Sequence, residues 1–67
     1  MDYKFDIFKK LSDGNPRWIT AIQGLVEAKN RMARLALISP GGYFIYLQGD
    51  GIVAELSPNH QQWAEVT

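Results

Sequence analysis

The stretch LVEAKNRMARLALISPGGYFIYLQ, residues 25–48, decides the fold, because a helical pattern gives way to a strand pattern across one short break. Within residues 25–38, apolar side chains recur every three or four positions, which is the spacing of one face of an α-helix. Gly24 is a suitable N-cap, and Pro40 ends the helix because proline disfavours helical geometry in the residue before it. The apolar stripe consists of Leu25, Ala28, Met32, Leu35 and Ala36.

The residues after this helix predict a β-hairpin. Residues 43–48 read Tyr-Phe-Ile-Tyr-Leu-Gln, which is rich in strand-forming side chains. Gly49-Asp50-Gly51 is typical of a hairpin turn, and residues 52–56 alternate apolar with smaller or polar side chains.

The residues before the helix predict another hairpin. Residues 3–11 alternate as a strand, residues 12–16 are a dense turn cluster, and residues 17–23 are the returning strand. Phe8 and Lys9 break the alternation, and a β-bulge near Ile7-Phe8 would repair it. On the returning strand, simple alternation places Trp18, Thr20 and Ile22 on one face.

These segments follow the order ββαββ, which predicts an α+β fold with a four-stranded sheet and one helix packed on one face. Two strand orders fit: a β-grasp-like 2-1-4-3, in which the first and last strands pair in parallel, and a fully antiparallel 2-1-3-4. Residues 1–67 are expected to make a single domain. Residues 59–67 form either a short helix, since Asn59 and Gln62 resemble a capping box, or a flexible tail.

Four runs of strand, turn and cap residues span most of residues 3–54: Phe5-Asp6-Ile7-Phe8, Asp13-Gly14-Asn15-Pro16-Arg17-Trp18-Ile19, Leu25-Val26-Glu27-Ala28 and Ser39-Pro40-Gly41-Gly42-Tyr43-Phe44-Ile45-Tyr46. Together they resemble a group of short uncharacterised bacterial proteins with a ββαββ pattern and no assigned activity. These motifs are structural, so the resemblance implies no functional residue.

Composition excludes several kinds of chemistry. The chain has seven basic and seven acidic residues, one histidine and no cysteine, so disulfides and thiolate zinc ligands are absent. The solitary His60 and the scattered carboxylates predict no catalytic site, no metal site and no cofactor, and we expect no enzyme activity. Without a signal-peptide pattern or a membrane-spanning run, we expect a cytoplasmic protein that does not bind membranes.

One helix covers only one face of a sheet, so apolar side chains remain for the other face. We expect this open face to carry Phe8, Trp18, Ile22 and one or two of Tyr43, Phe44 and Tyr46, with Tyr46 in the predicted interaction surface. Exposed aromatic groups of this kind often mark interfaces. The alternative is that the tail folds over this face through Trp63.

A second apolar surface is predicted on the helix. Val26, Ala33 and Leu37 lie about 100° round from the main stripe. Either surface would suit a symmetric homodimer, which would also relieve the small core of a 67-residue chain. The alternative is a scatter of single exposed apolar residues, which is ordinary.

The leading functional hypothesis is a small binding or interaction module that self-associates, or that has an unknown protein partner. A nucleic-acid-binding domain is the alternative, because aromatic side chains on a sheet with basic residues nearby suit single-stranded RNA. The basic residues are Lys29, Arg31 and Arg34 on the helix and Lys9, Lys10 and Arg17 near the first hairpin. The zero net charge argues against this alternative. A small enzyme, or an enzyme subunit, centred on His60 is the third hypothesis.

Overall fold

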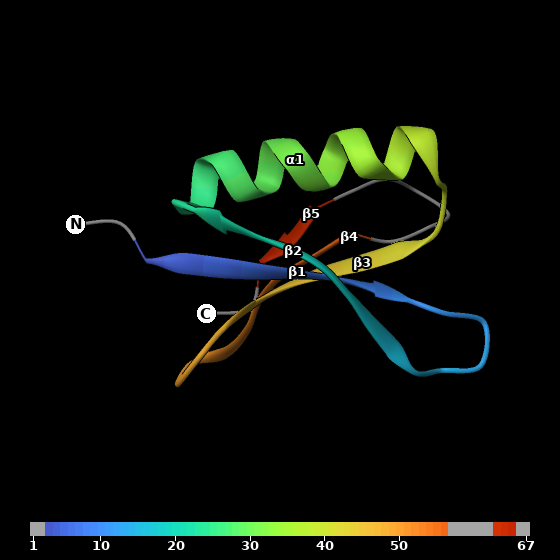
Figure 1. The fold of residues 1–67 in the computed structure, drawn as a ribbon, viewed down its shortest axis with the longest axis horizontal. Coiled ribbons are helices and arrows are strands. Elements are labelled where there is room, and N and C mark those ends of the chain that lie inside the picture. Colours follow the sequence, from blue (N-terminus) through green and yellow to red (C-terminus); the bar gives the residue numbers. More distant parts are fainter. Residues whose placement is uncertain (1–2, 57–62, 66–67) are drawn as a thin grey trace.

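The computed structural model describes residues 3–56 and, further along the chain, the backbone of residues 63–65. One helix lies across one face of a twisted antiparallel sheet (Figure 1). The elements are β1 (Lys4–Lys10), β2 (Pro16–Gln23), α1 (Leu25–Ile38), β3 (Gly42–Leu47), β4 (Gly51–Leu56) and β5 (Trp63–Glu65). The predicted α+β class and the ββαββ order are confirmed.

The strand order is β2-β1-β3-β4-β5, and every neighbouring pair is antiparallel. The structure therefore has the antiparallel 2-1-3-4 order, and the β-grasp-like order with a parallel pair of first and last strands is not adopted. The burial of β3 explains this choice, because Gly42–Ile45 are all buried. A strand that is apolar on both faces is most stable in the middle of a sheet, whereas β4, which carries Glu55, tolerates a more outward position.

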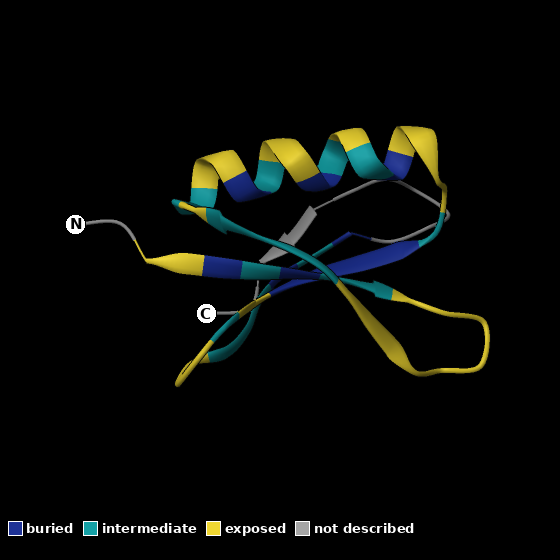
Figure 2. Ribbon diagram, viewed as in Figure 1, coloured by how far each residue is buried: buried dark blue, intermediate teal, exposed yellow. Residues whose placement is uncertain are grey.

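The core lies between α1 and the sheet face that the helix covers (Figure 2). From the helix it receives Ala28, Met32 and Ala36, which recur every fourth residue on one face. Small alanines at two of these positions let the helix approach the sheet closely. The sheet contributes Phe5, Ile7, Tyr43, Ile45, Ala54 and Leu56.

The predicted irregularity near Ile7-Phe8 is present, because the β1–β2 register shifts between these two residues. Ile7 pairs with Thr20 while Phe8 pairs with Trp18, so the extra residue is Ile19 in β2 and not a residue of β1. The bulge turns Trp18 away from the helix and leaves Ile22, which pairs with the core residue Phe5, on the helix side. The expectation that Trp18 and Ile22 share the open face is therefore wrong, since a bulge reverses the alternation of the strand beyond it.

The C-terminal end of α1 is held by side chains from two strands. The Tyr43 hydroxyl donates to the Ser39 carbonyl oxygen at 2.5 Å, and Lys9 Nζ donates to Ser39 Oγ at 2.5 Å. Lys9 Nζ also lies 5.7 Å from the centroid of the Tyr43 ring. The last turn of α1 has no basic residue of its own, so Lys9 supplies the positive charge that a helix C-terminus favours.

Residues 63–65 form the short strand β5, which pairs with β4 and extends the sheet at that edge. The sequence predicted either a short helix or a flexible tail for residues 59–67, and this strand lies within that segment. The residues that carried the helix expectation, Asn59 and Gln62, lie outside the described residues, and so does His60.

Candidate functional site

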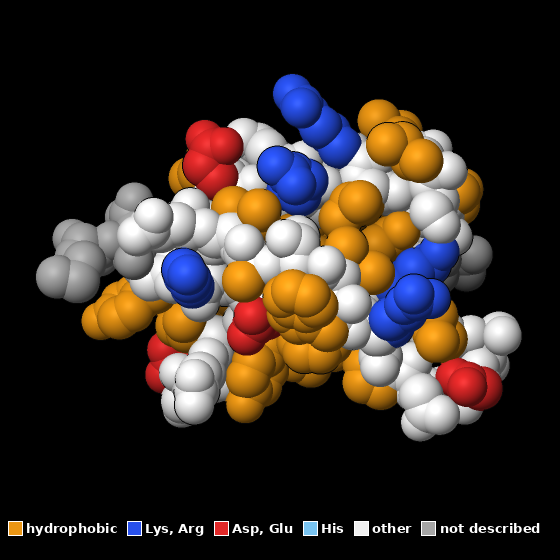
Figure 3. Space-filling model, in the orientation of Figure 1, with side chains coloured by type: hydrophobic (Ala, Val, Ile, Leu, Met, Phe, Trp, Pro, Cys, Tyr) orange, Lys and Arg blue, Asp and Glu red, His pale blue; other side chains and the backbone are white. Residues whose placement is uncertain are grey.

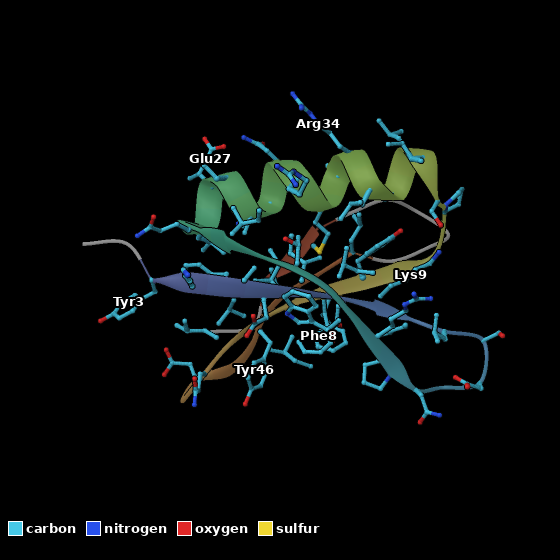
Figure 4. All side chains as sticks on the ribbon, viewed as in Figure 1. Tyr3, Phe8, Lys9, Glu27, Arg34 and Tyr46 are labelled. Atoms are coloured by element: carbon cyan, nitrogen blue, oxygen red, sulfur yellow. The ribbon has the colours of Figure 1, made fainter. Side chains whose placement is uncertain are left out.

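The candidate site is the sheet face opposite α1. Figure 4 shows Phe8 and Tyr46 on the side of the sheet away from the helix, whereas Glu27 and Arg34 project from the outer side of the helix. Phe8 lies in β1, next to the centre of the sheet, and its register partners are Trp18 on β2 and Phe44 on β3. Three neighbouring strands thus bring aromatic side chains to one place.

The aromatic rings on this face pack on one another. The Phe8 and Phe44 rings are stacked, with centroids 5.0 Å apart and planes 9° apart. Tyr46 meets the same Phe8 ring edge to face, with centroids 6.2 Å apart and planes 86° apart. Both arrangements are favoured by the aromatic quadrupole and contribute about 0.5–1.5 kcal/mol beyond the buried area. This packing restricts the orientations of the three rings.

Trp18 completes the group, which we call the open-face cluster: Phe8, Trp18, Phe44 and Tyr46. Its indole Nε1 donates to Asp6 Oδ1 at 3.2 Å, which orients a ring that is 55% exposed. Phe44 is 9% exposed and Tyr46 36%, so the cluster has a covered centre and an accessible rim. Figure 3 shows hydrophobic side chains gathered below the helix on one side of the molecule.

Charged side chains lie around the open-face cluster. Asp6 and Lys10 flank Phe8 at two residues on either side along β1, so all three point to the same face. Glu55, on β4, is the register partner of Phe44. Lys10 Nζ lies 3.8 Å from Glu55 Oε1, and this contact passes over Gly42, which pairs with Lys10 and has no side chain to obstruct it.

The structure brings together three of the seven residues predicted to form an interaction surface: Phe8, Trp18 and Tyr46. Ile22 packs against the core instead, and Tyr43, which the sequence left as a further candidate, is buried on the helix side. Phe44 belongs to the cluster because it is the register partner of Phe8. Phe44 lies between the core residues Tyr43 and Ile45 on β3, so strand alternation places its side chain on the opposite face of the sheet.

The predicted helix surface is a separate and looser feature. Val26 and Leu37 are each 72% exposed, Ala33 between them is half-buried, and Ile38 at the end of the helix is also exposed. Val26 and Leu37 are eleven residues apart, which is about 16 Å along a helix axis. They belong to α1, which lies on the other side of the sheet from the open-face cluster, so they do not form one surface with it.

The described residues contain no other arrangement with evident chemistry. Across residues 3–56, no three His, Asp or Glu side chains are grouped so that they could hold a metal ion. A shallow hollow beside the end of α1 is lined in part by Lys9, Arg17 and Tyr43, but Lys9 and Tyr43 there already bind Ser39. Over the same part of the chain, α1 is too short and too polar to cross a membrane.

Comparisons with protein-family models, curated proteins and solved structures returned no match to this chain. The resemblance to short bacterial ββαββ proteins therefore stays a prediction.

Proposed function

We propose that this domain is a protein-interaction module and that the open-face cluster is its binding surface. The observation that carries the proposal is a packed aromatic group on a sheet face that none of the described residues covers. Tyr and Trp are enriched where protein interfaces gain most of their binding energy, and Trp18 and Tyr46 are the accessible members of this cluster.

The rigidity of the cluster supports a binding role. Its rings project from three adjacent strands and are held by the stack on Phe8 and by the Trp18–Asp6 hydrogen bond. Ordering a flexible aromatic side chain on binding costs about 0.5–1.5 kcal/mol, and a surface that is ordered beforehand avoids most of that cost.

The charges around the cluster favour a protein partner over a nucleic acid. Asp6 and Glu55 flank the rings together with Lys10, which is already paired with Glu55, and Lys4 lies two residues beyond Asp6 on the same face of β1. The helix bases run along the other layer, where the labelled Arg34 points away from the sheet. Phosphate backbones need cations beside the stacking rings, and these four charges give the face no net positive rim.

The proposal assigns no catalysis to the domain and places it in the cytoplasm of a bacterium. The absence of cysteine from the chain is compatible with that compartment.

Site-specific photo-crosslinking in the cells that express the chain tests the proposal. A benzophenone amino acid replaces Tyr46 in one variant and Arg34, on the outer side of the helix, in the control. We expect a discrete protein adduct from position 46, identified by mass spectrometry, and none of comparable yield from position 34. Equal adducts from both positions, or none from position 46, would contradict an interaction through this face.

A further inference from the structure

We propose that the partner of the open-face cluster is a second copy of this chain, packed face to face about a twofold axis that runs across the strands at Phe8. The inference rests on the proposed function and names its partner. It is carried by the order of side chains on β1, where Asp6, Phe8 and Lys10 share the open face.

The two charges lie at equal distances from the aromatic centre. Two residues of an antiparallel strand span about 6.8 Å, so Asp6 and Lys10 stand about that far from Phe8 in opposite directions. From Asp6 to Lys10 the pattern on this face is therefore negative, aromatic, positive, and Lys4 at the start of the strand has no charged counterpart at the other end of β1. Reversing the strand end to end exchanges the two charges and returns Phe8 to its own place.

When two copies pack face to face, the charges on one β1 lie over the charges on the partner's β1. A twofold axis across the strands sets β1 antiparallel over the partner's β1, with Phe8 over the partner's Phe8 and Asp6 over the partner's Lys10. A twofold axis along the strands would set like charges over each other. A symmetric interface must be complementary to itself, so the charges select the first arrangement.

The same axis brings the other members of the cluster into the interface. Trp18 and Phe44 are the register partners of Phe8, so they lie level with it and meet their own copies across the axis. Stacked sheets pack about 10 Å apart, and their side chains interdigitate over that distance. Two bare sheet faces would thus become one shared apolar layer, as in a sandwich, with a helix on each outer side.

Glu55 is a charge that this arrangement places near its own copy. It lies level with Phe44 on β4, two strands from β1, so it approaches the partner's Glu55 at the rim. Each Glu55 remains beside its own Lys10, at 3.8 Å within one chain, and solvent screens charges at a rim. We therefore expect Glu55→Gln to tighten the association of two copies.

Charge-reversal variants of the purified chain test the proposal. Sedimentation equilibrium from micromolar to submillimolar concentration measures their molecular mass. We expect the wild type to reach twice the 7.6 kDa mass of one chain. Asp6→Lys and Lys10→Asp, each alone, should weaken self-association about 100-fold, because every single change places two like-charge contacts in a symmetric dimer. An equal mixture of the two variants should form a heterodimer, because both contacts between them are then attractive.

Matched controls carry the same charge changes on the outer side of the helix. Glu27→Lys and Arg34→Asp should associate as the wild type does, and circular dichroism should show all variants folded. A monomeric wild type would overturn the proposal, as would dimeric single variants or a mixture that stays monomeric.

The two proposals fail separately. A monomeric wild type together with a discrete adduct to a different protein at position 46 would overturn self-association and leave the interaction module in place. No adduct at position 46 and no dimer would overturn both. A dimer that ignores the charge reversals at Asp6 and Lys10 would overturn this twofold arrangement.

Discussion

At the scale of single residues, Phe8 and Lys9 interrupt the alternation of apolar and polar side chains on β1, and each of them has a specific contact. Phe8 stands among the polar side chains of β1 because it is the centre of the open-face cluster. Lys9 stands on the apolar side because its ammonium reaches Ser39 at the end of α1. β1 therefore alternates regularly, and the two residues that broke the expected pattern are those with specific partners.

Tyr43 and Tyr46 allow a matched prediction about hydrogen bonding at the residue scale. Tyr43→Phe removes the hydroxyl that donates to the Ser39 carbonyl oxygen, and we expect the free energy of unfolding to fall by about 1 kcal/mol. Tyr46→Phe removes a hydroxyl on the open face, where water can replace its bonds, and should change stability by less than about 0.5 kcal/mol.

Urea denaturation at one fixed protein concentration measures both tyrosine variants. Equal losses of stability would show that the Tyr43 hydroxyl does not hold the helix end.

At the scale of elements, the bulge in β2 decides which side chains reach the open face. The extra residue Ile19 packs against the core, and the strand on either side of it faces opposite ways. Trp18 thereby joins the aromatic rings, while Ile22 joins the core. A bulge also suits β2 as an edge strand, because local twist and Pro16 at its start discourage pairing with another sheet edge.

The turn between β1 and β2 depends on Gly14. Its φ is 89°, its N–H donates to the Leu11 carbonyl oxygen at 2.9 Å, and no atom lies within 4 Å of the position that a Cβ would take. Replacement therefore tests backbone conformation without a steric clash. We expect Gly14→Ala to lower the free energy of unfolding by about 1 kcal/mol, and Gly14→Asn by less, since asparagine tolerates positive φ.

Thermal and urea unfolding of the two Gly14 variants give the comparison. An alanine variant as stable as the wild type would mean that the turn readily adopts another conformation.

At the scale of the whole molecule, one helix on a five-stranded sheet makes two layers, and residues 3–56 leave the second face of the sheet uncovered. A chain of 67 residues buries a small core, and stability at this size is commonly marginal. A second copy that covers the uncovered face would add an apolar layer without lengthening the chain. Stability and assembly are then coupled.

That coupling predicts a melting temperature that depends on protein concentration. We expect the midpoint of thermal unfolding to rise with concentration in the wild type, because only the folded chain associates. In the Asp6→Lys variant the midpoint should stay constant over the same range. Differential scanning fluorimetry across a hundredfold dilution measures the melting temperature. By mass action, that dilution changes the free energy of association by about 2.7 kcal/mol. Parallel behaviour of the two chains would argue against coupling through the open face.

Local patterns in the sequence determined the elements of this protein. The period of the stripe from Leu25 to Ala36 predicts α1, and turn residues at 12–16 and 49–51 predict the two hairpins, because these signals act between near neighbours. The same local reasoning placed Phe8, Trp18 and Tyr46 on the open face.

Only the tertiary structure decided which strands are neighbours and which face each side chain takes. The antiparallel contact of β1 with β3 joins residues 32 to 40 positions apart, and it depends on how well β3 fills the middle of the sheet. The bulge at Ile19, which separates Trp18 from Ile22, depends on the register of β2 against β1. The periodicity of a sequence reflects which side chains of one segment are apolar. The pairing register of two strands depends on how both segments pack together.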